Sequence, residues 1–142
     1  MPTASISLDQ PALPGMCPVT EAVEALAHRS ASTDRGAVFT RREVVDFMLD
    51  LIGYTADRDL HALRLLEPSA GEGDFLLPAV GRLLQSWSRS GLPASVLDDC
   101  IRAVELHHLS CLHTSAAVQQ LLCAHGVQAP EAARIAGLWL VQ

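Results

Sequence analysis

Residues 65–77 read LLEPSAGEGDFLL, and this stretch predicts a strand, a tight glycine turn and a helix in that order. The apolar run from Leu63 to Leu66 predicts a strand that ends at Pro68, because proline has no N–H to donate to a sheet ladder. After the glycines, the apolar residues from Phe75 onward change to helical spacing. We therefore predict a helix over about residues 75–89.

The two glycines of the turn, Gly71 and Gly73, permit positive φ and a close approach of the backbone to a ligand. Such a turn directs several backbone N–H groups to one place beside a helix N-terminus, which suits an anionic or carboxylate-bearing ligand. A Gly-x-Gly pair is a weak signal, so an ordinary strand–turn–helix joint explains the glycines equally well. A phosphate loop of the nucleoside-triphosphatase kind is excluded, since the chain contains no lysine.

The composition is typical of a single soluble domain in a reducing compartment. The chain has 142 residues, of which 49% are apolar, and its four cysteines form no Cys-x-x-Cys pair. Neither a signal peptide nor an apolar run of transmembrane length is visible, so we expect a cytoplasmic protein without membrane contact. The spacing of Cys111 and His113 fits no zinc template, and we predict no metal site. A net charge of −6 is unsuited to non-specific nucleic-acid binding.

The N-terminal third divides into a flexible segment over residues 1–35, with one short helix at 21–28, and the start of a domain at residue 36. Thr40 and Glu43 have the spacing of a capping box, followed by a broad apolar helical face that Gly53 ends. A well-capped amphipathic helix is therefore predicted directly before the first strand.

Two more strands are predicted, at residues 101–106 and 138–141, with a helix over 109–125 between them and a short turn or helix at 130–134. Alternating helices and strands predict an α/β fold with three parallel strands and helices on both faces of the sheet. Ligands of such sheets bind at the carboxyl ends of the strands, where Glu67 and Glu105 both lie. A strand-end carboxylate can accept hydrogen bonds from ribose hydroxyls, although a plain surface acid explains Glu105 as well.

Three separated motifs, taken in order, resemble the N-terminal part of the N6-adenine DNA methyltransferases of restriction–modification systems, in the TaqI-like gamma arrangement. A Phe/Tyr-Thr-x-x-x-Val-Val-x-Phe-Met segment of that family matches FTRREVVDFM at residues 39–48. The family's cofactor loop, Leu-(Asp/Glu)-Pro-(Ala/Ser)-x-Gly-x-Gly-x-Phe-Leu, matches LEPSAGEGDFL at 66–76. The acid of its second strand matches VEL at 104–106, and the likeness runs from about residue 36 to 141.

The resemblance implies a partial Rossmann-like, S-adenosylmethionine-dependent methyltransferase fold over residues 36–142, with S-adenosylmethionine as cofactor. It implies that Thr40 and its neighbours lie against the methionine end of the cofactor, that Glu67 and the loop backbone hold its amino-acid part, and that Glu105 accepts the ribose hydroxyls. The matching positions are Phe39, Thr40, Glu67, Pro68, Ala70, Gly71, Gly73, Glu105 and Leu106.

The family's catalytic Asn-Pro-Pro-(Tyr/Phe) motif and its target-recognition domain have no match in this chain. The resemblance thus implies the cofactor-binding portion of a site-specific DNA adenine methyltransferase, inactive by itself, which would meet DNA only through downstream regions. A second chain that completes the domain is a further partner consistent with this interpretation. The alternatives are a methyltransferase of the same fold that acts on protein or RNA, and a non-catalytic remnant that binds a partner.

In the family's sheet the first strand is central, so its outer edge would be open in this chain. Because exposed apolar edges favour association, we predict that the isolated chain oligomerises or aggregates.

Overall fold

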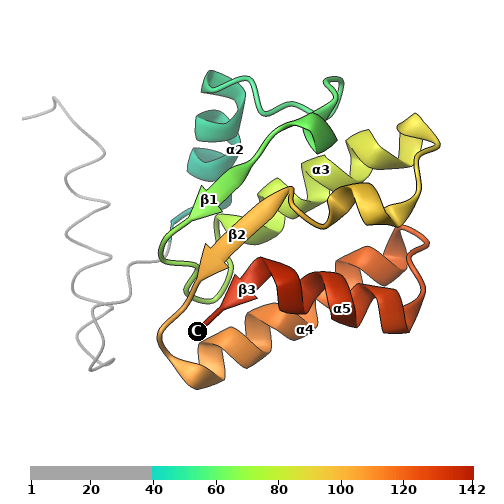
Figure 1. Cartoon of the computed structure of the whole chain (residues 1–142). Coiled ribbons are helices and arrows are strands. Elements are labelled where there is room, and N and C mark those ends of the chain that lie inside the picture. Colours follow the sequence, from blue (N-terminus) through green and yellow to red (C-terminus); the bar gives the residue numbers. More distant parts are fainter. Residues whose placement is uncertain (1–39) are drawn as a thin grey trace, which may run out of the picture. The chain divides into compact units, whose positions relative to one another are not determined.

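A parallel sheet of three strands, with helices packed against it, forms the part of the chain that the computed structural model describes, residues 40–142 (Figure 1). The predicted helix at 21–28 and Phe39 lie outside these residues. The elements in order are α2 (Arg42–Leu51), η1 (Leu60–Ala62), β1 (Leu65–Glu67), α3 (Leu76–Ser90), η2 (Ala94–Leu97), β2 (Ile101–Val104), α4 (His108–Ala124), α5 (Ala129–Trp139) and β3 (Leu140–Val141).

The strands lie in the order β1-β2-β3, and both pairs are parallel, as the alternating pattern predicts. Leu65 is level with Ile101, and Ala103 is level with Leu140. Paired residues of a parallel sheet point to the same face, and so do alternate residues along one strand. Leu65, Ile101, Ala103 and Leu140 therefore all point to one face of the sheet. Within the described residues β1 pairs only with β2, so the predicted open edge at β1 is present.

The helices of residues 40–142 cover one face of this sheet, whereas the prediction placed helices on both faces. Ile101, Ala103 and Leu140 are buried on the covered face, whereas Leu66 and Val141 on the other face are 70% and 49% exposed. The helices form a continuous layer in which α2 packs on α3, α3 on α4 and α4 on α5. The prediction of both faces followed from alternation, which does not specify the side to which each helix returns.

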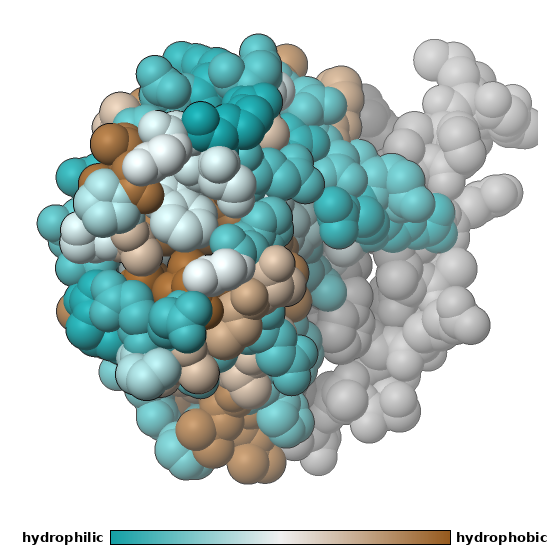
Figure 2. Space-filling view, turned by 90° about the vertical axis from the view of Figure 1, so that its right-hand side faces the viewer, coloured by the Kyte–Doolittle hydropathy of each residue, from teal (hydrophilic) through white to brown (hydrophobic). Residues whose placement is uncertain are grey.

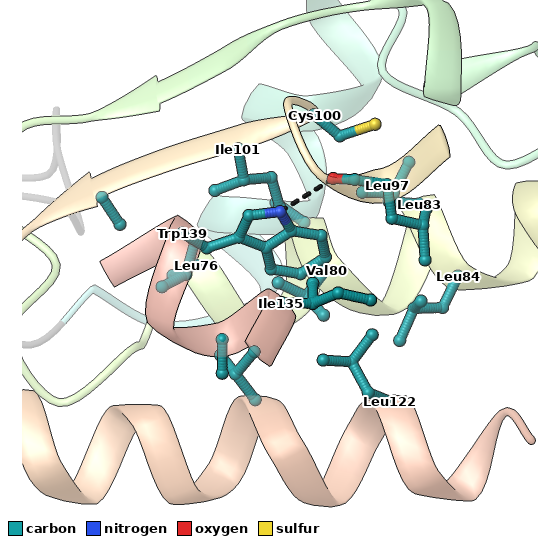
Figure 3. Close-up of a cluster of buried hydrophobic side chains, with 14 of the residues drawn as sticks. Leu76, Val80, Leu83, Leu84, Leu97, Cys100, Ile101, Leu122, Ile135 and Trp139 are labelled. Carbon is teal, nitrogen blue, oxygen red and sulfur yellow. Dashed lines mark hydrogen bonds between the residues drawn. The ribbon is translucent and has the colours of Figure 1, made fainter. Parts of the chain in front are cut away.

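The core lies between the covered face and the helices, and Trp139 is its largest fully buried side chain (Figure 3). Its indole ring lies among side chains from α3, α4 and β2, and its Nε1–H donates to the carbonyl of Leu97 over 2.8 Å. The rest of the core is mainly leucine, alanine and valine. Hydrophilic residues dominate the surface seen in Figure 2, and hydrophobic ones gather there in small patches.

Helix α5 occupies part of the segment predicted as the third strand. The helix continues through Trp139, and β3 is only the two residues Leu140 and Val141. Pro130 lies in the first turn of α5, and Ala132, Ile135, Ala136 and Trp139 are buried at helical spacing. The apolar run at 138–141 is compatible with a helix or a strand. The helix continues through Trp139 because this conformation buries the indole ring in the core.

The predicted capping box at the start of α2 is wrong. The N-cap residue is Arg41 in extended conformation, one position after Thr40, and no side chain caps the helix. Glu43 therefore lies in the first turn without a capping hydroxyl opposite it. Arg82 of α3 instead secures the helix from the side, because its guanidinium donates to carboxylates of Asp46 and Asp50 and to the carbonyl of Tyr54.

Candidate functional site

The glycine turn between β1 and α3 has the backbone geometry that its sequence predicts. Gly71 and Gly73 have φ values of 53° and 91°, in the left-handed region that favours glycine. The amide of Ala70 donates to the carbonyl of Val104 over 2.9 Å, and the amide of Gly73 donates to the carbonyl of Ala70 over 2.8 Å. The turn is thereby attached to the carboxyl end of β2 as well as to that of β1.

Glu105 brings the second strand into the same site. Its Oε2 accepts a hydrogen bond from the amide of Gly71 over 2.7 Å, and its Oε1 accepts one from the amide of His107 over 2.6 Å. The backbone amide of Glu105 donates to the carbonyl of Val141, so the acid also lies at the end of β3. Two residues that are 34 positions apart therefore meet at one rim of the sheet.

Two other predicted site residues lie beside this rim. The carboxylate of Glu67, the last residue of β1, accepts from the amide of Ser69 over 3.1 Å, which closes the chain around the exposed ring of Pro68. Leu106 directly follows Glu105 and is 84% exposed. A half-buried carboxylate thus ends β1, and an exposed leucine follows the acid at the end of β2.

Helix α4 also holds the glycine turn, a contribution that no sequence motif predicts. The Thr114 hydroxyl donates to the carbonyl of Gly71 over 3.0 Å, and the Ser110 hydroxyl donates to the carboxylate of Glu72 over 2.8 Å. Both α4 side chains are buried. They are one helical turn apart, so they share a face, but a serine and a threonine at this spacing are too common to be recognised in a sequence.

The histidines near the start of α4 extend this network. His107 is the N-cap of the helix, and its Nδ1 accepts from the amide of Ser110 over 3.3 Å. The ring of His113 lies with its Nδ1 3.8 Å from the other carboxylate oxygen of Glu72. Within residues 40–142 no group of three acidic, histidine or cysteine side chains could hold a metal ion.

Thr40 is the predicted site residue that the structure does not connect to the others. It is exposed immediately before α2, and no hydrogen bond within the described residues links it to the glycine turn or to Glu105. The structure therefore brings the second and third motifs together, and the role of Thr40 stays a prediction. No helix in residues 40–142 is long and apolar enough to span a membrane.

The parallel sheet, the glycine turn after its first strand and the acid after its second define a partial Rossmann-like domain of the methyltransferase class. Three curated type II methyltransferases are similar to the chain. M.PaeR7I of Pseudomonas aeruginosa is 52% identical over 136 residues, or 94% of this chain and 24% of that protein.

The other two relatives match a shorter stretch. M.XhoI of Xanthomonas vasicola is 48% identical over 113 residues, and M.BstVI of Geobacillus stearothermophilus is 39% identical over 111 residues. These matches cover 77% and 75% of this chain, and 21% and 20% of the relatives. No family model and no solved structure matches the chain. The chain is similar in sequence to these type II methyltransferases and spans a quarter or less of their length.

Proposed function

We propose that this chain is the S-adenosylmethionine-binding, N-terminal portion of a site-specific DNA adenine-N6 methyltransferase of a restriction–modification system. The observation that carries the proposal is the hydrogen bond from the amide of Gly71 to Glu105, which joins the two cofactor motifs at the carboxyl ends of β1 and β2. That rim is where open α/β sheets bind their ligands.

The free acceptor positions of Glu105 fit a ribose diol. Each carboxylate oxygen has two lone pairs, and the amides of Gly71 and His107 occupy one on each oxygen. One lone pair therefore remains on each oxygen, so two adjacent hydroxyls can donate to the same carboxylate while the loop stays closed. Exposed Leu106 offers an apolar surface for the base that such a ribose carries.

The amino-acid part of the cofactor would lie over the glycine turn. The backbone of Ala70, Gly71 and Gly73 runs close to the start of α3, where the positive end of the helix dipole favours a carboxylate. Glu67, half-buried at the end of β1, would supply a negative charge for the ammonium group. Thr40, with Phe39 before it, is proposed to complete this end of the site.

The methyl-transfer step needs residues that these 142 do not contain. The chain has no asparagine, so the Asn-Pro-Pro-(Tyr/Phe) motif of the family cannot lie within it. Its net charge of −6 also gives it little means of gripping a DNA backbone. We therefore propose that DNA, and the flipped adenine, are held by further polypeptide, in the same chain or in a second one.

Cofactor binding is tested by calorimetry of the chain with S-adenosylmethionine and S-adenosylhomocysteine. We expect weak but saturable binding that Glu105→Ala abolishes, because this change removes the diol acceptor and releases the Gly71 amide. Glu43→Gln is the matched control, since it neutralises an exposed acid on α2 and should leave binding unchanged. Binding that Glu105→Ala leaves unchanged would remove the site assignment.

The DNA part of the proposal is tested by supplying the missing polypeptide. The chain is combined with the remainder of M.PaeR7I, in cis or as a second chain, and adenine methylation of DNA is assayed. Methylation is expected only in the combined protein. A well-folded complex that transfers no methyl group to adenine, but does methylate cytosine, RNA or a protein, would favour one of the other substrate classes.

A further inference from the structure

Helix α2 carries an apolar stripe that no described residue covers. Val45 and Leu49 are fully buried against the rest of the domain, as expected for an amphipathic helix. A second set of large apolar side chains on α2 faces away from the core, and its members are 45–74% exposed: Val44, Phe47, Met48, Leu51 and Ile52. Scattered exposed leucines need no explanation, but five such side chains within nine residues form a contiguous patch.

The stripe has the spacing of a helix–helix contact. Val44, Phe47, Met48 and Leu51 recur at intervals of three and four residues, which places them along one side of α2. Their exposed area is on the order of 500 Å² per chain, near the upper limit of the patches that monomers expose. Two such faces together would bury about 1,000 Å², the size at which specific interfaces begin.

We propose that the α2 stripe is the interface through which two copies of this chain associate, as an antiparallel helix pair about a two-fold axis. The axis would pass between Phe47 and Met48, so that each phenyl ring meets the partner's methionine. Val44 would then face the partner's Leu51. The stripe is thus complementary to itself, which is the requirement of a two-fold interface. Sulfur–aromatic contacts add to the burial of apolar area.

The charges at the ends of α2 are compatible with the same arrangement. Arg41 and Arg42 lie at its N-terminus together with Glu43, and the last turn contains no basic residue to offset the negative end of the dipole. Arg42 pairs with Asp46 of its own helix over 2.7 Å. In an antiparallel pair, Arg41 of each copy would lie near the C-terminal end of the partner's helix, where its charge meets the negative end of the dipole. Asp50 at that end is already bound by Arg82 of its own chain, so the dipole supplies this attraction.

The N-terminal segment of the same chain is a poorer occupant of the stripe. The predicted helix at 21–28 has only Val23, Leu26 and Ala27 on its apolar face, too little to cover five large side chains. Folded back as an antiparallel hairpin, it would also place Arg29 beside the arginines that begin α2. A second copy supplies both a matching apolar area and opposite charges at the ends.

Sedimentation velocity of the full chain between 1 and 500 µM tests the proposal. We expect a monomer–dimer equilibrium with a dissociation constant between about 1 µM and 1 mM. Phe47→Glu should weaken the dimer by about tenfold or more, because it places a charge at the centre of the interface. Leu66→Glu, on the exposed sheet face at the edge strand β1, is the control and should not change it. Circular dichroism confirms that both variants fold.

Mixing two variants tests the register independently. Phe47→Glu and Met48→Arg should each be monomeric alone, and should form a mixed dimer, because position 47 of one copy faces position 48 of the other. A chain that stays monomeric at 500 µM overturns the proposal. So does a dimer that Leu66→Glu dissociates and Phe47→Glu does not, which would indicate pairing through the open edge of β1, or a failure of the mixed variants to associate.

Discussion

Replacing Gly73 by alanine should destabilise the domain much more than the same replacement at Gly71, two residues earlier. At Gly73 the φ value is 91°, and an added Cβ would lie 2.9 Å from Leu77 Cγ and 3.3 Å from Thr114 Cγ2. At Gly71 the φ value is 53°, and no heavy atom lies within 4 Å of the added Cβ. The two sites share the backbone penalty, but only one has a steric clash.

The expected magnitudes follow from these two contributions. A left-handed conformation costs a non-glycine residue about 1–2 kcal/mol, and this cost applies at both positions. Overpacking a filled site adds about 1–3 kcal/mol, and this cost applies only at Gly73. In a domain of this size 1 kcal/mol corresponds to about 4–8 °C in Tm. Gly73→Ala should therefore melt roughly 5–20 °C below Gly71→Ala.

Thermal and urea unfolding of both variants, followed by circular dichroism, measures the difference. Leu77→Ala provides a double-mutant cycle, because shortening Leu77 removes the nearest atoms from the added methyl group. Gly73→Ala should then cost less in the Leu77→Ala background than in the natural chain. Equal losses at Gly71 and Gly73, or a Gly73 penalty that does not depend on residue 77, would refute the steric argument.

Three other outcomes are expected. Thr114→Val should raise amide hydrogen exchange throughout the glycine turn, because a carbonyl loses its donor, whereas Thr114→Ser keeps the hydroxyl and the protection. Trp139→Phe should lower the free energy of unfolding in urea by about 1–3 kcal/mol, since the smaller ring leaves part of the core unfilled and the carbonyl of Leu97 keeps only the Cys100 amide as a donor. Hydrogen bonds from Arg42 and Arg82 lower the pKa of Asp46, so their stabilising effect is complete above the carboxyl's unfolded pKa and is lost as pH falls through the lower folded value. The difference in Tm between Arg82→Met and the natural chain should therefore shrink from pH 6 to pH 2.5, and the part that comes from the carbonyls of Asp46 and Tyr54 should remain.

The local parts of the fold could be predicted from the sequence because they depend on the chemistry of single residues. Pro68 limits the first strand, and Gly71 and Gly73 adopt the positive φ values that only glycine takes without strain. The meeting of Gly71 with Glu105 was also predictable, since both follow parallel strands and such ends lie at one edge of a sheet. The motifs further indicated a methyltransferase of a restriction–modification system, and the relatives are type II methyltransferases.

Errors arose where a short pattern fits two structures. Leu138-Trp139-Leu140-Val141 is apolar enough for a strand, yet Trp139 ends a helix, because its ring fills the space between α3 and the sheet. The pair Thr40 and Glu43 has capping-box spacing, yet the chain enters α2 one residue later, at Arg41. Neither outcome is a property of the residues alone, since each depends on where a neighbouring element lies.

The sequence by itself determined the strand–turn–helix unit and the alternation that produces a parallel sheet, and it predicts a ligand for the amides and carboxylates at the rim of that sheet. Only the tertiary structure decided which face the helices cover, that Ser110 and Thr114 hold the glycine turn, and that α2 leaves a second apolar side exposed. The physical reason is the distance along the chain over which each effect acts. Backbone preferences act between neighbouring residues, whereas burial and the hydrogen bonds between residues 38 and 43 positions apart form only after the elements have packed.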